Sequence, residues 1–152
     1  MVAFAIVSLI NLNHKVKGRE MHIGLLEDDT AIQEMLRLVL QDEGYTVTIY
    51  STADACLNAL TAPEQNSAET PIDLLIVDWR LSGSIPGTEV IRKLRNDTSF
   101  DSLPIILTTA ATFNNTEELQ KLHVSLLEKP FTVDEVVDMI KELVQSSTPT
   151  DD

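Results

Sequence analysis

The sequence LLIVD occupies residues 74–78, where four aliphatic side chains run directly into an aspartate. Three other segments share this pattern of an apolar run that ends in reactive polar residues: LLEDD at 25–29, IILTT at 105–109 and LLEKP at 126–130. A nearly unbroken apolar run is typical of a parallel strand that is covered on both faces. Since open parallel sheets bind ligands at the carboxyl ends of their strands, the sequence predicts that these polar ends meet at one edge.

Strand-like and helix-like segments alternate along the rest of the chain. Their hydrophobic spacing predicts five strands, at 22–27, 45–50, 72–77, 104–109 and 124–127. It also predicts five helices, which cover 30–43, a segment that begins at 51, 88–95, 116–122 and 132 to about 146. Asp29 is a natural N-cap, and Ser51 and Thr132 each begin a capping-box pattern. Five strands alternating with five helices predict an α/β fold, in which helices cover both faces of a five-stranded, doubly wound parallel sheet through right-handed crossovers.

Length and charge limit the kinds of partner that the chain can have. Its 152 residues fit one domain. It has 24 acidic and 11 basic residues, and the net charge of −13 disfavours direct binding to nucleic acid, which needs clustered lysine and arginine. Cys56 is the only cysteine, so no internal disulfide can form, and we expect a small buried hydrophobic residue in a reducing cytoplasm.

The first twenty residues differ in character from the remainder. Residues 1–10 are apolar, but they are too few to cross a bilayer, and the basic residues follow them where a secretory signal has them first. Residues 17–20 resemble a translated ribosome-binding tract, which supports the hypothesis that Met21 is the natural start. We therefore expect an N-terminal appendage at 1–20, one domain at 21–146, a disordered tail at 147–152, and no membrane partner.

The polar strand ends provide a specific set of chemical groups. Each alone has an ordinary explanation, such as a helix cap or a solvated lysine, but together they indicate a functional site: Glu27, Asp28, Asp78, Thr109 and Lys129. Several carboxylates in one cleft stay ionised together when a cation joins them, and oxygen ligands favour Mg²⁺. A divalent ion beside a carboxylate, a hydroxyl and an ammonium suits phosphoryl transfer, with Asp78 as the candidate nucleophile.

On these residues, the segment from 21 to about 146 resembles the receiver domain of two-component response regulators, the family that includes the chemotaxis regulator. The resemblance implies a flavodoxin-like sheet with strand order 2-1-3-4-5. It also implies that Asp78 is the phosphoacceptor, that Thr109 turns toward the phosphoryl group, and that Lys129 precedes a cis proline. Mg²⁺ is then held by Asp28, Asp78 and the main-chain carbonyl of Arg80, with Glu27 acting through water. The implied partners are a histidine kinase or phosphotransfer protein and a downstream effector protein.

The chain departs from the family pattern in three places, one of which is a span from Thr109 to Lys129 that is about two residues shorter than in the chemotaxis regulator. After Asp78, Ser82 and Pro86 stand where the family usually has proline and glycine, and Gly87 comes one residue later, which implies one inserted residue. Leu126 replaces the aromatic residue that commonly reports phosphorylation. We therefore expect an altered or absent aromatic switch.

Other interpretations remain open at this point. A degenerate receiver could act as an unphosphorylated interaction module, and the chain could be the receiver part of a longer DNA-binding regulator. A phosphatase acting through an aspartyl intermediate needs a second aspartate where Arg80 stands, and no glycine-rich nucleotide-binding motif is present. We expect no enzymatic activity beyond self-catalysed phosphorylation and dephosphorylation of the aspartate.

Overall fold

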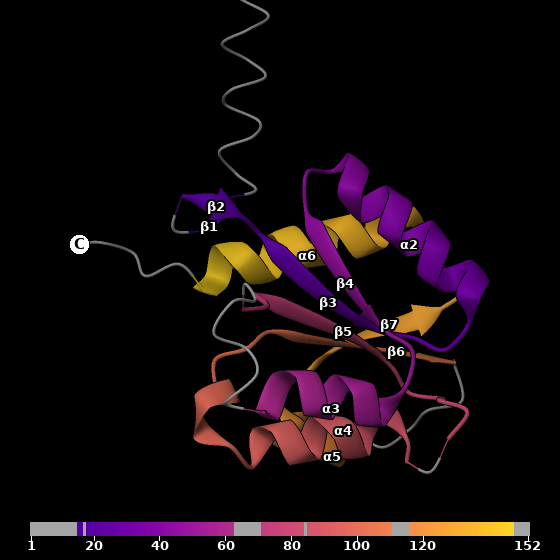
Figure 1. Cartoon of the computed structure of the whole chain (residues 1–152), viewed down its shortest axis with the longest axis vertical. Helices are drawn as coiled ribbons and strands as arrows, with labels where there is room; N and C mark the ends of the chain where they lie inside the picture. The colour runs from indigo at the N-terminus through magenta and orange to yellow at the C-terminus, as the bar shows by residue number, and fades with distance from the viewer. Residues whose placement is uncertain (1–14, 17, 63–70, 84, 111–115, 148–152) are drawn as a thin grey trace, which may run out of the picture.

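The computed structural model describes residues 15–16, 18–62, 71–83, 85–110 and 116–147. Its centre is a five-stranded sheet in the order β4-β3-β5-β6-β7, in which all neighbouring strands are parallel (Figure 1). The strands are β3 (His22–Leu26), β4 (Thr46–Tyr50), β5 (Leu74–Asp78), β6 (Ile105–Ala110) and β7 (Ser125–Lys129). Counted along the chain this is the order 2-1-3-4-5, so the predicted fold and topology are confirmed.

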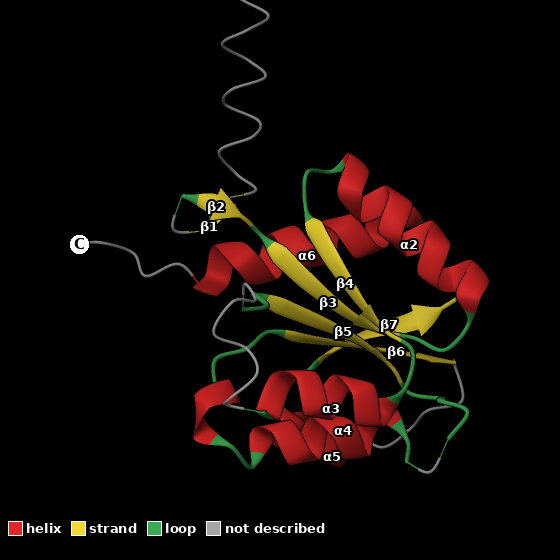
Figure 2. Cartoon of the chain, viewed as in Figure 1, coloured by secondary structure: helices red, strands yellow, loops and turns green. Residues whose placement is uncertain are grey.

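Helices cover both faces of the sheet, as the alternating pattern predicts (Figure 2). On one face α2 (Thr30–Asp42) and α6 (Val133–Ser147) bury residues such as Leu36 and Ile140 against the sheet. On the other face lie α3 (Ala53–Thr61), α4 (Gly87–Arg95) and α5 (Thr116–Leu122), which enclose a second apolar core. Because β5 is central, all five of its residues are buried, which explains its unbroken apolar sequence.

Two of the three predicted N-terminal caps, Asp29 and Thr132, are confirmed. The Asp29 carboxylate accepts hydrogen bonds from the main-chain N–H groups of Ala31 (2.9 Å) and Ile32 (3.1 Å). Thr132 and Glu135 form the reciprocal bonds of a capping box. Gly44, the predicted end of the first helix, has the left-handed φ of +94° that a glycine accepts readily.

One local prediction was wrong, and the structure adds two details. Ser51 is not the N-cap of α3, because the extended residue there is Thr52, whose hydroxyl accepts the N–H of Ala55. A short 3₁₀ helix, η1 (Thr98–Phe100), was not predicted; the Asp97 carboxylate caps it. Helix α6 extends through Ser147, so the residues left for the predicted tail, 148–152, lie outside the described part of the chain.

The described residues before Met21 contact the domain. Strands β1 (Lys15–Val16) and β2 (Arg19–Glu20) form a small antiparallel pair that was not predicted. The Arg19 guanidinium donates two hydrogen bonds to the carboxylate of Asp73, at 2.7 and 2.8 Å, and this carboxylate also accepts the main-chain N–H of His22. Arg19 is therefore anchored at the start of β5. Most of the predicted appendage, residues 1–14, lies outside the described ranges.

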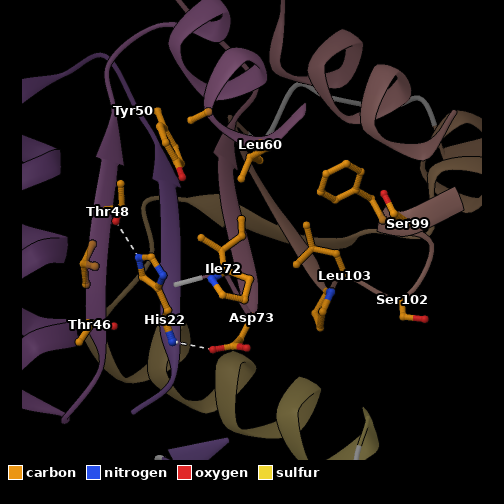
Figure 3. Close-up of a pocket in the computed structure, with 15 residues that line it drawn as sticks. His22, Thr46, Thr48, Tyr50, Leu60, Ile72, Asp73, Ser99, Ser102 and Leu103 are labelled. Atoms are coloured by element: carbon orange, nitrogen blue, oxygen red, sulfur yellow. Dashed lines mark hydrogen bonds between the residues drawn. The ribbon is translucent and has the colours of Figure 1, made fainter. Parts of the chain in front are cut away.

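A pocket of about 1050 Å³ opens at the amino ends of the strands, beside His22, Thr48 and Asp73 (Figure 3). The His22 ring nitrogen Nε2 lies 2.6 Å from the Thr48 hydroxyl. None of the predicted site residues lines this pocket. They follow the opposite, carboxyl ends of the strands.

Cys56 is fully buried in the core beneath α3, as predicted, and burial raises the pKa of its thiol to about 12.

Candidate functional site

The carboxyl ends of β3 and β5 bring three carboxylates together. Glu27 and Asp28 directly follow β3, and Asp78 is the last residue of β5. Each of them offers a carboxylate oxygen, and these oxygens all lie within 4.8 Å of one another. Glu27 and Asp78 are buried, whereas Asp28 lies at the rim. The sheet thus produces the acidic cluster that the strand ends predict.

Lys129, the last residue of β7, delivers a cation to this cluster. Its Nζ atom lies 3.2 Å from Oδ1 of Asp78 and 3.8 Å from Oε2 of Glu27. The peptide bond between Lys129 and Pro130 is cis, as the resemblance implies. The ammonium therefore compensates part of the negative charge that three neighbouring carboxylates create.

Thr109 lies on β6, the strand that separates β5 from β7. Asp78 is paired with Thr108 in the sheet, which places Thr109 one residue beyond the end of β5. The Thr109 side chain is only 1% exposed, and its hydroxyl oxygen has no hydrogen-bond partner in the described part of the chain. Buried hydroxyls nearly always have a partner, which makes this one a candidate to bind a ligand.

Burial sets the charge of Glu27. The pKa of this carboxyl is raised to about 7, chiefly by loss of water and also by the nearby Asp78 charge, while the N–H of Asp29 and the Lys129 ammonium oppose the rise. In the protein without a metal, the protonated and ionised forms of this carboxyl are therefore about equally populated near neutral pH. A metal cation would replace that proton.

Asp28 has a different environment, which the sequence did not reveal. Its Oδ2 atom accepts the main-chain N–H of Ser82, in the loop after β5, at 2.7 Å. The Ser82 hydroxyl and this N–H lower the pKa of Asp28, so that its carboxylate is readily ionised. In the sequence alone, Ser82 is only a departure from the family pattern.

The loop between β5 and α4 is held close to Asp78. The N–H of Gly87 donates to the carbonyl of Trp79 at 2.9 Å, and a Cβ atom added at Gly87 would overlap the carbonyl oxygen of Asp78. Trp79 packs against the α3–α4–α5 core. The Arg80 guanidinium carbon lies 5.4 Å from the centre of the Trp79 ring.

The donor set fits a hard divalent cation. Carboxylate oxygens are the ligands that Mg²⁺ prefers, and the three carboxylates outnumber the single ammonium beside them. Cation binding at this edge would relieve the remaining repulsion between them.

Comparison with known proteins agrees with this arrangement. Residues 23–141 match the model of the response regulator receiver domain. The phosphate regulon transcriptional regulatory protein PhoB of Rhizobium meliloti is 32% identical over 130 residues, which cover 84% of this chain and 53% of that protein. The transcriptional regulatory protein FixJ of Bradyrhizobium diazoefficiens is 28% identical over 130 residues, covering 84% of this chain and 58% of FixJ. The chain thus spans about half the length of these curated relatives.

Solved structures show the same fold. A CheY-like receiver domain protein from Methanospirillum hungatei superposes with a TM-score of 0.70 at 23% identity, covering 84% of this chain and 95% of that one. The signal receiver domain of a histidine kinase from Syntrophus aciditrophicus gives a TM-score of 0.73 at 20% identity, covering 86% and 95%.

Within the described residues, no helix combines the length and apolar character needed to cross a membrane.

The family match includes all five strands of the sheet except His22 and ends inside α6. With its parallel sheet and the acidic cluster at the carboxyl edge, the chain belongs to the response regulator receiver domain family of two-component signal transduction.

Proposed function

We propose that this chain accepts a phosphoryl group on Asp78 from the histidine of a kinase or phosphotransfer protein. The observation that supports this most directly is the position of Asp78, a buried carboxylate 3.2 Å from the Lys129 ammonium and clustered with Glu27 and Asp28. We further propose that Asp28, Asp78 and the main-chain carbonyl of Arg80 hold Mg²⁺, with Glu27 acting through water. When bound, Mg²⁺ neutralises charge on the phosphoryl oxygens during transfer.

In the transfer, a carboxylate oxygen of Asp78 attacks phosphorus, and the bond from phosphorus to the donor's imidazole nitrogen breaks. The electron pair of that bond returns to the imidazole, and an aspartyl phosphate remains on Asp78. Lys129 and the main-chain N–H of Arg80 both donate to Oδ1 of Asp78, so Oδ2 is the attacking oxygen. Thr109 then donates its hydroxyl to a phosphoryl oxygen, and Lys129 balances the added negative charge.

Phosphorylation would then change the affinity of the surface near α5, β7 and α6 for an effector protein. The acidic net charge of −13 argues against direct contact of this chain with nucleic acid. The two curated relatives described above are named transcriptional regulators, and the match covers only 53% and 58% of their lengths. Output through a DNA-binding domain attached to the same protein is therefore the alternative to a separate effector. We place the protein in the cytoplasm, where its lone cysteine stays reduced.

Intact-mass spectrometry tests the phosphoacceptor role. Incubation with acetyl phosphate and Mg²⁺ should add the mass of one phosphoryl group to the wild-type protein and none to Asp78→Asn. Asp54→Asn, which removes an exposed carboxylate on α3, is the control and should be modified as fully as the wild type. An adduct of equal size in Asp78→Asn would reject the proposal.

A degenerate receiver that acts without phosphorylation is the second candidate, favoured by Ser82 and Leu126 at two positions where the family differs. Titration with Mg²⁺ separates the two candidates. A working site should change the fluorescence of Trp79, the single tryptophan, which lies next to Asp78. A site that has lost its function should give no saturable change.

A further inference from the structure

Asp28 is held by a residue that is distant in sequence. Its Oδ2 atom lies 2.7 Å from the main-chain nitrogen of Ser82, and the two residues are 54 positions apart. Asp28 itself lies at the rim of the cluster, in a hollow of about 550 Å³ that it shares with the loop after β5. A rim carboxylate without such a bond would rotate freely in water.

The other two carboxylates of the cluster are also fixed by donors. The N–H of Asp29 donates to Oε1 of Glu27 at 3.1 Å, and Lys129 donates to Oδ1 of Asp78 at 3.2 Å. The bond from Ser82 to Asp28 is the shortest of the three. Hydrogen bonds of this kind orient the ligands of a metal ion.

The donor is a main-chain group, so the residue type at this position decides whether it exists. Serine supplies an N–H, whereas the proline usual at this position of the family has none. The loop that carries Ser82 is closed at its end by the bond from Gly87 to Trp79, which keeps the N–H in place. The serine therefore makes possible a contact that a proline at this position cannot form.

We propose that Ser82 is a positioning residue of the metal site, whose main-chain N–H holds the Asp28 carboxylate toward Glu27 and Asp78. This inference rests on the proposed function, because it takes the carboxylate cluster to be a Mg²⁺ site. Loss of such a supporting bond weakens metal binding by roughly 10- to 100-fold. Binding of the metal is then coupled to the conformation of the loop after β5.

Two substitutions at the same position separate the main-chain donor from the side chain. Ser82→Pro removes the N–H, and Ser82→Ala keeps it but removes the hydroxyl. Measured by isothermal titration with MgCl₂, the Kd should rise at least about tenfold in Ser82→Pro. It should rise clearly less in Ser82→Ala, which keeps the N–H and loses only the hydroxyl that also acts on Asp28. Equal affinity in Ser82→Pro and wild type would overturn the inference, and so would equal weakening in both variants, which would make the hydroxyl the donor.

Proline could also weaken metal binding by changing the whole loop. A measurement without metal, on a variant that keeps Ser82, tests the hydrogen bond itself. In EDTA, the Ser82 amide proton in the ¹H–¹⁵N spectrum should move upfield and exchange faster in Asp28→Ala than in the wild type, because its carboxylate acceptor is gone. An unchanged Ser82 amide would overturn the inference. If the wild type binds no Mg²⁺, the proposed metal site fails and this inference with it. If only the Ser82 predictions fail, the metal site stands.

Discussion

The Nζ atom of Lys129 lies 3.2 Å from Oδ1 of Asp78, although 51 residues separate the two in the sequence. The same ammonium is 3.8 Å from Oε2 of Glu27. One cation thus serves two buried carboxylates, and its side chain remains 30% exposed, so it can follow the charge when a phosphoryl group arrives. This geometry supports the proposed part of Lys129 in the transfer.

We predict that Lys129→Gln slows phosphorylation of Asp78 by acetyl phosphate by roughly 100-fold, because a positioned donor to the transition-state charge is lost. The rate is measured by intact-mass spectrometry at fixed Mg²⁺ concentration. Lys93→Gln removes an exposed lysine on α4 and should leave the rate unchanged. Equal rates in Lys129→Gln and wild type would remove Lys129 from the mechanism.

Removal of the Thr109 hydroxyl should have opposite effects on stability and on function. Its buried hydroxyl lacks a partner in the described part of the chain, so Thr109→Val should stabilise the unphosphorylated protein by about 1 kcal/mol. The same substitution should shorten the lifetime of the phosphoprotein or abolish its switching. Urea unfolding measures the stability. The fraction of phosphorylated protein that remains with time, followed by mass spectrometry without an effector, measures the lifetime. A destabilised Thr109→Val would show that the hydroxyl already has a partner.

The raised pKa of Glu27 predicts a pH-dependent stability in the absence of metal. Between its ordinary value of 4.5 and about 7, the carboxyl binds a proton in the folded chain but not in the unfolded chain. Because the folded state then holds more protons, the free energy of unfolding should fall as pH rises from 5 to 8. Urea unfolding in EDTA at these pH values measures the slope.

Glu27→Gln is the matched control for this pH effect, since it removes the titrating group and should flatten the slope. Asp28, whose pKa is lowered from 3.8, contributes stability that is lost only below about pH 4, so it does not interfere in this range. An undiminished slope in Glu27→Gln would assign the effect to another group.

The fold was predictable because it rests on local patterns. The unbroken apolar run in β5 and the alternation of Val47 and Ile49 with threonines in β4 follow from their central and edge positions in the sheet. The N-cap of α3 was misplaced by one residue, because Ser51 and Thr52 are both good capping residues. Only the extended backbone of Thr52 in the folded chain distinguishes them.

The contacts that the sequence did not predict join residues that no local sequence pattern relates. The bond from Ser82 to Asp28 and the ion pair of Arg19 with Asp73 each join residues 54 positions apart. No spacing rule relates such residues, since their proximity depends on how the strands are ordered in the sheet. The acidic cluster itself could be predicted because each of its members ends a recognisable strand.

Gly87 provides the last prediction, because the site depends on close contact between α4 and the end of β5. An added Cβ would overlap the Asp78 carbonyl oxygen and lie 2.8 Å from a methyl carbon of Val77. We expect Gly87→Ala to lower the free energy of unfolding by about 1–3 kcal/mol and to weaken Mg²⁺ binding by displacing Asp78. Gly83→Ala is the matched control, because a Cβ there meets no atom within 4 Å, and its stability should stay within about 0.5 kcal/mol of the wild type. Urea unfolding and Mg²⁺ titration of both variants measure these effects, and equal behaviour of the two alanines would show that α4 can move away from Asp78 at little cost.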